Sequence, residues 1–447
     1  MNYQDFFKNK KITVMGLGLL GRGVGDAKFL AENGAELIVT DLKSEAALAD
    51  SIAALKEFPN ITFHLGGHDL ADFRDRDYIL KAAGVPQNSP FIAEARKNGI
   101  PIKMSASWFA ELAGIPIIGV TGTRGKSTVT HLLYNIMETA GMHALLGGNV
   151  RGVSTLALLP RVLPDSIGVF ELDSWQCQGF GEAGISPTVA VFTSFFPDHM
   201  NYYLDLDAYL ADKAHIFLHQ NPEDTLVVSH QAADIIREHY GRKIQSHVVI
   251  ADAAHLPDGW TIALLGSHNI ENAMCAVEAA RALGIDDAVI KRGLALFSGL
   301  SGRLEFVLEI NGVRIYNDNS STTPDATIAG LRAVGDVSVK KVVLIMGGDD
   351  KKLDMSALIT EIPKWCSAVV LFKERGTDRI RDQVFELKKK GVAVYEEEGL
   401  LATVARAFKV AQTGEVILYS PAFSSFGKYF KNEFDRGDQF VKLVQAL

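Results

Sequence analysis

A glycine-rich stretch, GVTGTRGKST at residues 119–128, constrains this chain more than any other feature. It follows the apolar run IPII at 115–118 and precedes an amphipathic helical pattern at 131–137. A strand, a glycine-rich loop and a helix in this order are typical of a nucleotide phosphate loop. Backbone N–H groups of such a loop and of the helix N-terminus bind phosphate oxygens. We therefore predict a nucleotide site formed by Gly122, Thr123, Gly125, Lys126, Ser127 and Thr128, with Lys126 on the outer phosphates and Ser127 on Mg²⁺.

Length and composition indicate a soluble protein of several domains. The 447 residues, 47% hydrophobic and 22% charged, are too many for one core. A net charge of −8 argues against nucleic acid as the main partner. The three cysteines are too far apart for a zinc motif or a disulfide framework. With no signal-peptide profile and no apolar run of membrane length, we expect a cytoplasmic protein without membrane insertion.

The first of three predicted domains, residues 1–113, begins like a dinucleotide-binding unit. A strand at 11–15 leads into GLGLLG at 16–21 and a helix to about Asn33, and a second strand at 36–40 is followed by Asp41. This βαβ pattern with an acid after the second strand favours NAD or another nucleotide held by its diphosphate or sugar. The phosphate loop is the stronger nucleotide signal, which makes NAD the less favoured reading.

The other two domains are predicted at residues 114–301 and 302–447. A linking helix at 105–112 precedes the second, which contains apolar strands at 167–172, 188–193 and 225–228. The third opens with a hairpin around Asn311-Gly312 and then alternates helices and strands. The expected fold is α/β: a Rossmann-like N-terminal domain, a central P-loop ATPase-like domain and a C-terminal Rossmann-like domain.

Several polar residues follow predicted strands of the central domain. Glu171 ends the strand at 167–172, where a carboxylate could hold Mg²⁺ or simply be exposed. His199 follows the strand at 188–193. Lys213 lies in a helical stretch at 207–218 and, on its own evidence, is best explained as a solvated lysine.

Polar groups elsewhere also suggest ligand contacts. Asn269 and Asn272 share one helix face and could bind a base edge, or the first could cap the helix. In the third domain, three polar loops at 317–324, 347–352 and 419–426 follow strands. They predict a binding rim at one edge of its sheet.

Taken in order, these motifs resemble the Mur ligase family of peptidoglycan synthesis over nearly the whole chain. The matching segments are GLGLLG, TGTRGKST, GGN at 147–149, FELDSWQ at 170–176, PDHM at 197–200, HNIENA at 268–273, NDNSSTTPDA at 317–326, GGDDKK, SPAFSSF and RG at 436–437. The branch of the family that adds D-glutamate is the most similar.

The resemblance implies an ATP-dependent amide ligase acting on UDP-N-acetylmuramoyl-L-alanine and D-glutamate. ATP phosphorylates the substrate carboxylate, and the amine of D-glutamate attacks the acyl phosphate. By resemblance the catalytic residues are Lys126, Glu171, His199, Lys213 and Arg303. Two Mg²⁺ ions are implied, one held by Ser127 with Glu171 and one served by His199 with a carbamoylated Lys213. We expect a monomer.

The resemblance also assigns the remaining contacts. The first domain holds the UDP-sugar instead of NAD, through Gly18, Leu19, Leu20, Asp41, Gly84 and Asn149, with His199 also near this substrate. ATP is held through Asn269 and Asn272 at adenine, Arg303 at the transferring phosphate and Asp318 at ribose. D-Glutamate is held through Thr322, Lys351, Ser425 and the segment 432–434, where Phe434 is the expected contact.

The chain departs from the family pattern at several of these sites. Ser320 stands where a lysine is usual, Gly302 replaces a histidine before Arg303, and Asp173 replaces a common serine. Residues 82–85 read AAGV instead of SPGI or SPGV, and the loop after Ser425 is one residue longer, so Glu433 competes with Phe434. The alternatives are a related ligase for another amino acid such as L-glutamate, a folylpolyglutamate synthase, an NAD-dependent dehydrogenase, or a non-catalytic binding protein.

Overall fold

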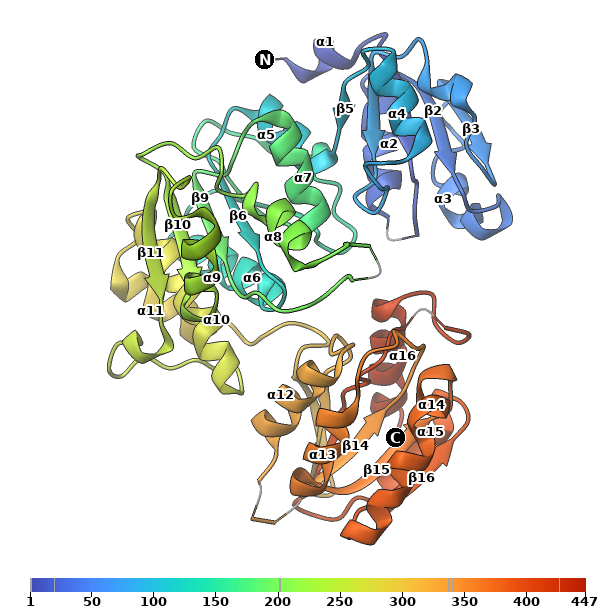
Figure 1. The fold of residues 1–447 in the computed structure, drawn as a ribbon, viewed down its shortest axis with the longest axis vertical. Helices are drawn as coiled ribbons and strands as arrows, with labels where there is room; N and C mark the ends of the chain where they lie inside the picture. The colour runs from blue at the N-terminus through green and yellow to red at the C-terminus, as the bar shows by residue number, and fades with distance from the viewer. Residues whose placement is uncertain (1, 20, 201, 337, 340, 426) are drawn as a thin grey trace. The chain divides into compact units, whose positions relative to one another are not determined.

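The structure, a computed structural model, describes residues 2–19, 21–200, 202–336, 338–339, 341–425 and 427–447. Leu20, predicted to contact the UDP-sugar, lies outside these residues. The chain forms two compact units, Met1–Thr261 with Glu271–Leu296, and Ile262–Ile270 with Phe297–Leu447. The first unit contains two sheets and the second contains one. The three-sheet α/β fold predicted from the sequence is confirmed (Figure 1), whereas domain boundaries at 113 and 301 stay predictions.

The N-terminal sheet is fully parallel and has the strand order β3-β2-β1-β4-β5. Its elements are α1 Tyr3–Phe7, β1 Lys11–Met15, α2 Arg22–Glu32, β2 Glu36–Asp41, α3 Ala49–Ala53, β3 Ile61–Leu65, β4 Tyr78–Lys81, α4 Pro90–Lys97 and β5 Ile102–Lys103. From β1, the strands β2 and β3 are added on one side and β4 and β5 on the other, so the direction of strand addition reverses between β1 and β4. The carboxyl ends of these two strands therefore flank the crevice in which such sheets bind ligands.

Helix α5, Ser105–Ala113, joins this sheet to the central one. Its Trp108 is 1% exposed and lies edge-to-face against Phe7, with ring centroids 5.1 Å apart. The Tyr78 ring lies 5.0 Å from the same indole. This aromatic cluster packs the connecting helix against the N-terminal domain.

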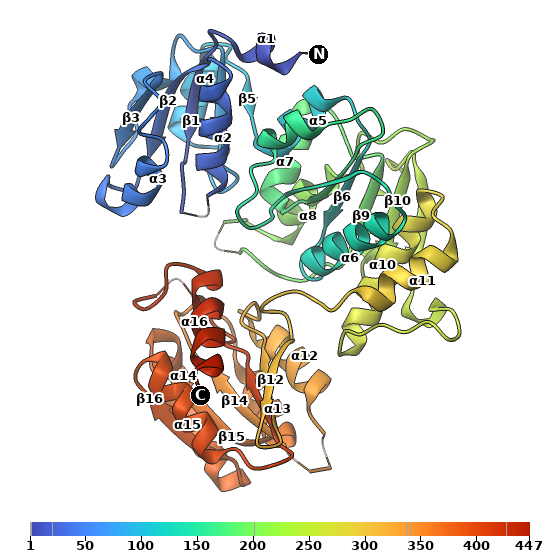
Figure 2. The same cartoon turned by 180° about the vertical axis from the view of Figure 1, so that it is seen from behind.

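The central sheet is also parallel, with the order β11-β10-β9-β6-β8-β7. Its elements are β6 Ile117–Thr121, α6 Lys126–Thr139, β7 Ala144–Gly148, β8 Ile167–Glu171, α7 Ser174–Ala183, β9 Val189–Phe192, α8 Leu206–Ala214, β10 Thr225–Ser229, α9 His230–Tyr240, β11 His247–Ala251, α10 Ser267–Ala282 and α11 Asp287–Leu296. Helices α7 and α8 pack together on one face, and α6 packs with α11 on the other (Figures 1 and 2). Strand β6 is buried throughout because both faces are covered.

The C-terminal sheet has the order β12-β13-β17-β14-β15-β16, with β12 antiparallel to β13 as the Asn311-Gly312 turn predicts. Its elements are β12 Glu305–Ile310, β13 Val313–Asn317, α12 Pro324–Val334, β14 Val342–Met346, α13 Ser356–Trp365, β15 Cys366–Phe372, α14 Arg375–Phe385, β16 Ala393–Glu397, α15 Leu400–Val410, β17 Val416–Tyr419 and α16 Glu433–Gln445. Alternate residues of β14 enter two separate cores. Leu344 faces the core shared with α12–α14, and Ile345 faces the core shared with α15 and α16. The parallel strands β13, β14 and β17 end at one edge, so the three polar loops follow neighbouring strands.

Candidate active site

The phosphate loop between β6 and α6 depends on two glycines. Gly122 has φ 144° and Gly125 has φ 86°, both in the region that favours glycine. A side chain at Gly122 would place its Cβ 2.1 Å from Oγ1 of Thr193, and one at Gly125 would place it 2.2 Å from Oδ1 of Asn272. Thr193 follows β9 and Asn272 lies on α10, so the loop is enclosed from both sides.

The end of β9 holds the loop through hydrogen bonds. Ser194 accepts from the Thr123 N–H through its carbonyl at 2.8 Å and from the Arg124 N–H through its hydroxyl at 2.8 Å. Thr193 Oγ1 lies 2.5 Å from the Arg124 carbonyl, to which it donates. The Arg124 guanidinium forms an ion pair with Asp198 at 2.9 Å. The segment around Asp198 and His199 therefore lies against the phosphate loop.

Two lysines converge on one carbonyl of this loop. Lys126 donates to the carbonyls of Gly122 and Thr123 at 3.1 and 3.2 Å, and Lys213 donates to the Gly122 carbonyl at 2.8 Å. Lys213 is 1% exposed, so its interpretation as a solvated helix lysine is wrong. The predicted helix at 207–218 ends at Ala214, and this places Lys213 on the last turn of α8 beneath the loop.

The environment of Lys213 disfavours its charged form. Burial, and after it the nearby Lys126 ammonium, lower the pKa of Lys213 to about 7. The centroid of the Tyr209 ring lies 4.7 Å from Nζ, and its face attracts the ammonium, which opposes the effect of burial without reversing it. A large fraction of this side chain is therefore an unprotonated amine near neutral pH.

Glu171 lies beside the phosphate loop and is held by a neighbouring asparagine. It ends β8 and pairs in register with Val120 of β6. Its side chain is buried, and Asn149 donates to its carbonyl from the backbone at 2.7 Å and to Oε1 from the side-chain amide at 3.4 Å. Ser127 is also buried, at the first turn of α6. Within the described ranges, no group of three or more His, Cys, Asp or Glu side chains forms a ready-made metal cage. Mg²⁺ that binds nucleotide usually takes one or two protein ligands and several phosphate oxygens, which suits Glu171 and Ser127.

His199 is held by an aromatic side chain that sequence analysis did not single out. Its backbone has φ 56°, which is uncommon for a residue with a side chain. Its ring lies 4.9 Å from the Trp175 ring and 6.1 Å from the Tyr209 ring. Trp175 belongs to the segment FELDSWQ, but nothing in the local pattern indicates that it contacts a residue on another loop.

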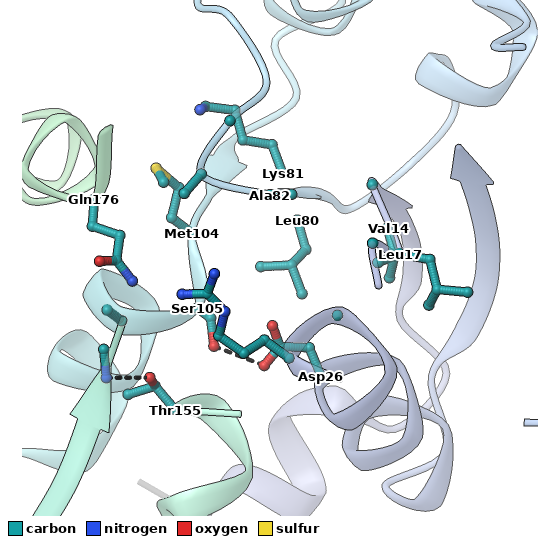
Figure 3. Close-up of a pocket in the computed structure, with 18 of the residues that line it drawn as sticks. Val14, Leu17, Asp26, Leu80, Lys81, Ala82, Met104, Ser105, Thr155 and Gln176 are labelled. Atoms are coloured by element: carbon teal, nitrogen blue, oxygen red, sulfur yellow. Dashed lines mark hydrogen bonds between the residues drawn. The ribbon is translucent and has the colours of Figure 1, made fainter. Parts of the chain in front are cut away.

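A pocket of about 200 Å³ opens at the crevice between β1 and β4 (Figure 3). Gly18, Leu19 and Gly84, predicted to bind the UDP-sugar, line it. Asp41 is linked to the same loop because its Oδ2 accepts from the Gly18 N–H at 3.0 Å. Gly148, which precedes Asn149, lines the pocket from the central domain.

Three charged residues that the sequence analysis missed, Arg22, Asp26 and Lys81, also line the pocket. Asp26 Oδ1 accepts from the hydroxyls of Ser105 and Ser154 at 2.7 and 2.6 Å. The first of these contacts is drawn in Figure 3. These bonds join α2 to α5 and to the loop after β7. Burial raises the pKa of Asp26 to about 6 despite the hydroxyl donors.

Helix α10 carries the two asparagines predicted to hold adenine. Asn272 lies against Gly125, as its close approach shows. Asn269 is buried in the first turn of α10, and its side-chain amide donates to the Leu265 carbonyl, just before the helix, at 2.7 Å. The adenine role of both stays a prediction.

In the C-terminal unit, the predicted amino-acid contacts lie on loops that touch one another. Lys351 donates to Oγ1 of Thr322 at 2.9 Å. Arg436, fully buried on α16, donates to the side chain and the carbonyl of Asn319 at 2.7 and 3.0 Å and to the carbonyl of Phe423 at 3.1 Å. It thereby connects the loops that carry Thr322 and Ser425 with the helix that carries Phe434, although the sequence marked it only as part of an RG pair.

Asp318, the predicted ribose contact, is buried under the same loops. Its oxygens accept from the Leu304 N–H at 3.2 Å and from the Ser420 hydroxyl at 2.8 Å. Burial raises its pKa to about 6. The Leu304 bond places the carboxylate beside the segment that contains Arg303, and Arg303 lowers the pKa of Asp318 through its charge as a weaker effect.

Together these observations define an α/β protein with a phosphate loop in its central domain and a separate pocket at the crevice of its N-terminal sheet. Three sequence models match the chain: "Mur ligase MurD-like, N-terminal domain" at residues 10–104, "Mur ligase middle domain" at 120–260 and "Mur ligase, glutamate ligase domain" at 302–423. The chain belongs to the Mur ligase family.

Similar proteins agree with this placement. A UDP-N-acetylmuramoylalanine–D-glutamate ligase of Roseiflexus sp. (strain RS-1) is 35% identical, with 98% of this chain and 99% of that protein covered. Proteins of the same name from Borreliella burgdorferi and from Streptococcus pneumoniae (strain P1031) are 34% and 32% identical, over 99% and 100% of both chains. Among solved structures, the UDP-N-acetylmuramate-alanine ligase of Thermotoga maritima has a TM-score of 0.63 at 19% identity, covering 98% of this chain and all of the other, and so supports the fold.

The raised pKa of Asp26 predicts that the parent and an Asp26 variant differ in stability by an amount that depends on pH. In the folded chain the pKa of Asp26 is about 6, whereas in the unfolded chain the carboxyl has its ordinary pKa of 3.8. Ionisation therefore lowers the free energy of unfolding as pH rises through this window. Asp26→Asn should gain stability over the parent between pH 4 and pH 7, by up to about 3 kcal/mol, in urea unfolding at each pH. Asp234→Asn, at an exposed carboxylate, is the control. A difference that stays constant with pH would show that Asp26 ionises normally.

Proposed function

We propose that this chain joins D-glutamate to UDP-N-acetylmuramoyl-L-alanine with cleavage of ATP to ADP and phosphate, in the synthesis of peptidoglycan precursors. The observation that carries the proposal is the phosphate loop, with Lys126, Glu171 and Lys213 gathered around it in a chain that matches all three Mur ligase domain models. The names of its full-length relatives supply D-glutamate as the amino acid. We place the reaction in the cytoplasm, carried out by a monomer.

In this reaction the carboxylate of the UDP-sugar substrate attacks the terminal phosphorus of ATP and ADP leaves. The amine of D-glutamate then attacks the acyl carbon, phosphate leaves, and the amine gives up a proton. Phosphoryl transfer depends mainly on positioning and charge neutralisation. Lys126 and the N–H groups of the phosphate loop would hold the ATP phosphates, and Arg303 would neutralise the group in transfer. The crevice at β1 and β4 would hold the UDP-sugar, and Thr322 with Lys351 would bind D-glutamate.

Family members are ATP-dependent and use Mg²⁺, and the residues present fit such a metal. Ser127 and Glu171 would hold one ion, and His199 with Lys213 would serve a second. When bound, Mg²⁺ neutralises phosphate and acyl oxygens. Since Glu171 is buried beside the phosphate loop and already oriented by Asn149, it is the most strongly supported of these ligands.

The second metal requires a change of charge at Lys213, because an ammonium would repel a cation. An unprotonated lysine amine adds to carbon dioxide, giving a carbamate and releasing a proton. The buried, charge-depleted amine of Lys213 has the chemistry for this step. The carbamate would also replace the repulsion between Lys126 and Lys213 by an attraction, which favours its formation.

The substrate assignment predicts a specific pattern of phosphate release. With ATP, Mg²⁺ and UDP-N-acetylmuramoyl-L-alanine, D-glutamate should support turnover and L-glutamate should not. The UDP-sugar should raise the melting temperature through binding to the folded state, whereas NADH should not, and Asp41→Ala should weaken the UDP-sugar effect. Turnover with L-glutamate or another amino acid would move the chain to a different branch of the family. A thermal shift with NADH would favour the dehydrogenase alternative.

Removing the phosphate-loop lysine should abolish most turnover without unfolding the chain. Hydrogen bonds to charged groups contribute about 1.5–3 kcal/mol each, and the Lys126 ammonium can donate more than one to the ATP phosphates, so Lys126→Ala should lower turnover at least about a hundredfold. Circular dichroism should remain that of the parent. Lys28→Ala, at an exposed helix lysine paired with Glu32, is the matched control and should be near normal. Near-normal turnover of Lys126→Ala would contradict the ATP site.

The carbamate predicts a rescue pattern at Lys213. Lys213→Ala should be nearly inactive and partly restored by acetate, which supplies a carboxylate in the space left. Lys213→Arg keeps the charge but cannot form the carbamate, so it should stay inactive. With isotope-labelled bicarbonate, carbon NMR of the parent should show a carbamate signal that is absent from both variants. Parent-like turnover of Lys213→Arg, or no such signal in active parent, would refute the modification.

A further inference from the structure

The charges that line the crevice between β1 and β4 are not equivalent. The Lys81 side chain is 2% exposed and its ammonium donates to the Val85 carbonyl at 2.9 Å, so it supports the loop after β4. Asp26 accepts hydrogen bonds from two serine hydroxyls. Arg22, the first residue of α2, is half-buried and donates one N–H to Oδ1 of Asn149. The Asp26 carboxylate attracts the Arg22 guanidinium through its charge, but no carboxylate in the described part of the chain forms a direct ion pair with it.

We propose that Arg22 binds the diphosphate of the nucleotide-sugar and sets the enzyme's preference for a nucleoside diphosphate, an inference that rests on the proposed function. Diphosphates in sheets of this order lie at the glycine-rich turn after the first strand and at the start of the following helix. Arg22 stands at that helix start and lines the pocket beside Gly18. A guanidinium has five N–H donors, which allows Arg22 to keep Asn149 and still bind phosphate oxygens in a two-bonded fork.

The contact with Asn149 gives Arg22 a second role as a positioning residue. Asn149 donates to both the carbonyl and the carboxylate of Glu171, the candidate Mg²⁺ ligand beside the phosphate loop. Arg22 and Asn149 therefore form a continuous polar connection from the N-terminal crevice to that carboxylate. A substrate whose diphosphate is bound by Arg22 would be fixed relative to the site of phosphoryl transfer. Lys81 has no equivalent connection, since its ammonium is directed to its own loop.

The test compares the affinities of UMP and UDP, which differ by one phosphate, in calorimetric titrations without ATP. The proteins are the parent, Arg22→Gln, Arg22→Lys and the control Arg74→Gln, whose arginine is exposed and pairs with Glu94. The parent should prefer UDP over UMP. Arg22→Gln should lose at least about tenfold in UDP affinity and little in UMP affinity, so the preference for UDP collapses. Arg22→Lys should restore part of it, and Arg74→Gln should behave as the parent.

The ratio of the two affinities separates a phosphate contact from a merely structural role. If Arg22→Gln keeps the parent's preference for UDP, or loses UMP and UDP affinity equally, the inference is wrong while the proposed function stands. If the parent binds neither nucleotide nor the UDP-sugar, the proposed function fails with it. In turnover, Arg22→Gln should raise the KM for the UDP-sugar and also lower kcat, because the connection to Glu171 is lost. An effect on the KM for ATP alone would contradict the assignment.

Discussion

The carbonyl of Gly122 brings the two buried-site lysines of the central domain close together, and their protonation states depend on this contact. Two lysines donate to it, Lys126 at 3.1 Å and Lys213 at 2.8 Å, and only a glycine fits there because any Cβ would overlap Thr193. Two ammonium groups this close in a buried site repel, so one is driven towards the neutral form. The deeper one, Lys213, yields because burial adds to the repulsion. The same loop geometry thus places a lysine with a lowered pKa beneath the phosphate loop.

Buried charges elsewhere are balanced by neutral dipoles and connect segments that form sites. Asp26 is held by the hydroxyls of Ser105 and Ser154, and Arg436 is held by carbonyl and amide groups of Asn319 and Phe423. Both arrangements are less stabilising than apolar packing of the same volume would be, because burying a charge costs desolvation free energy. Each instead fixes the relative positions of segments: Asp26 beside the crevice between β1 and β4, and Arg436 among the polar loops of the C-terminal sheet. The molecule accepts lower stability where ligand-binding loops must be held in one arrangement.

The sequence predicted the features that are determined by residues close together in the chain. Hydrophobic periodicity located the strands 11–15 and 167–172 within a residue of their observed ends, and the glycine pattern located the phosphate loop. It could not reveal contacts between segments far apart in the chain. Arg22 contacts Asn149 across 127 residues, and Arg436 contacts Asn319 across 117. Lys213 shows the same limit, because its helix carries no pattern that distinguishes a lysine under a distant loop from one in water.

Two of the departures from the family pattern in the C-terminal domain illustrate how contacts between distant segments change the interpretation of a sequence. Ser320 and Gly302 were separate anomalies in the sequence, but the Ser320 N–H donates to the Gly302 carbonyl at 2.9 Å. Gly302 has φ 74°, and a Cβ there would lie 3.3 Å from the Ser320 hydroxyl, a tight approach. A side chain at Gly302 would therefore crowd Ser320, so the two departures, 18 positions apart in the sequence, are in contact in the structure.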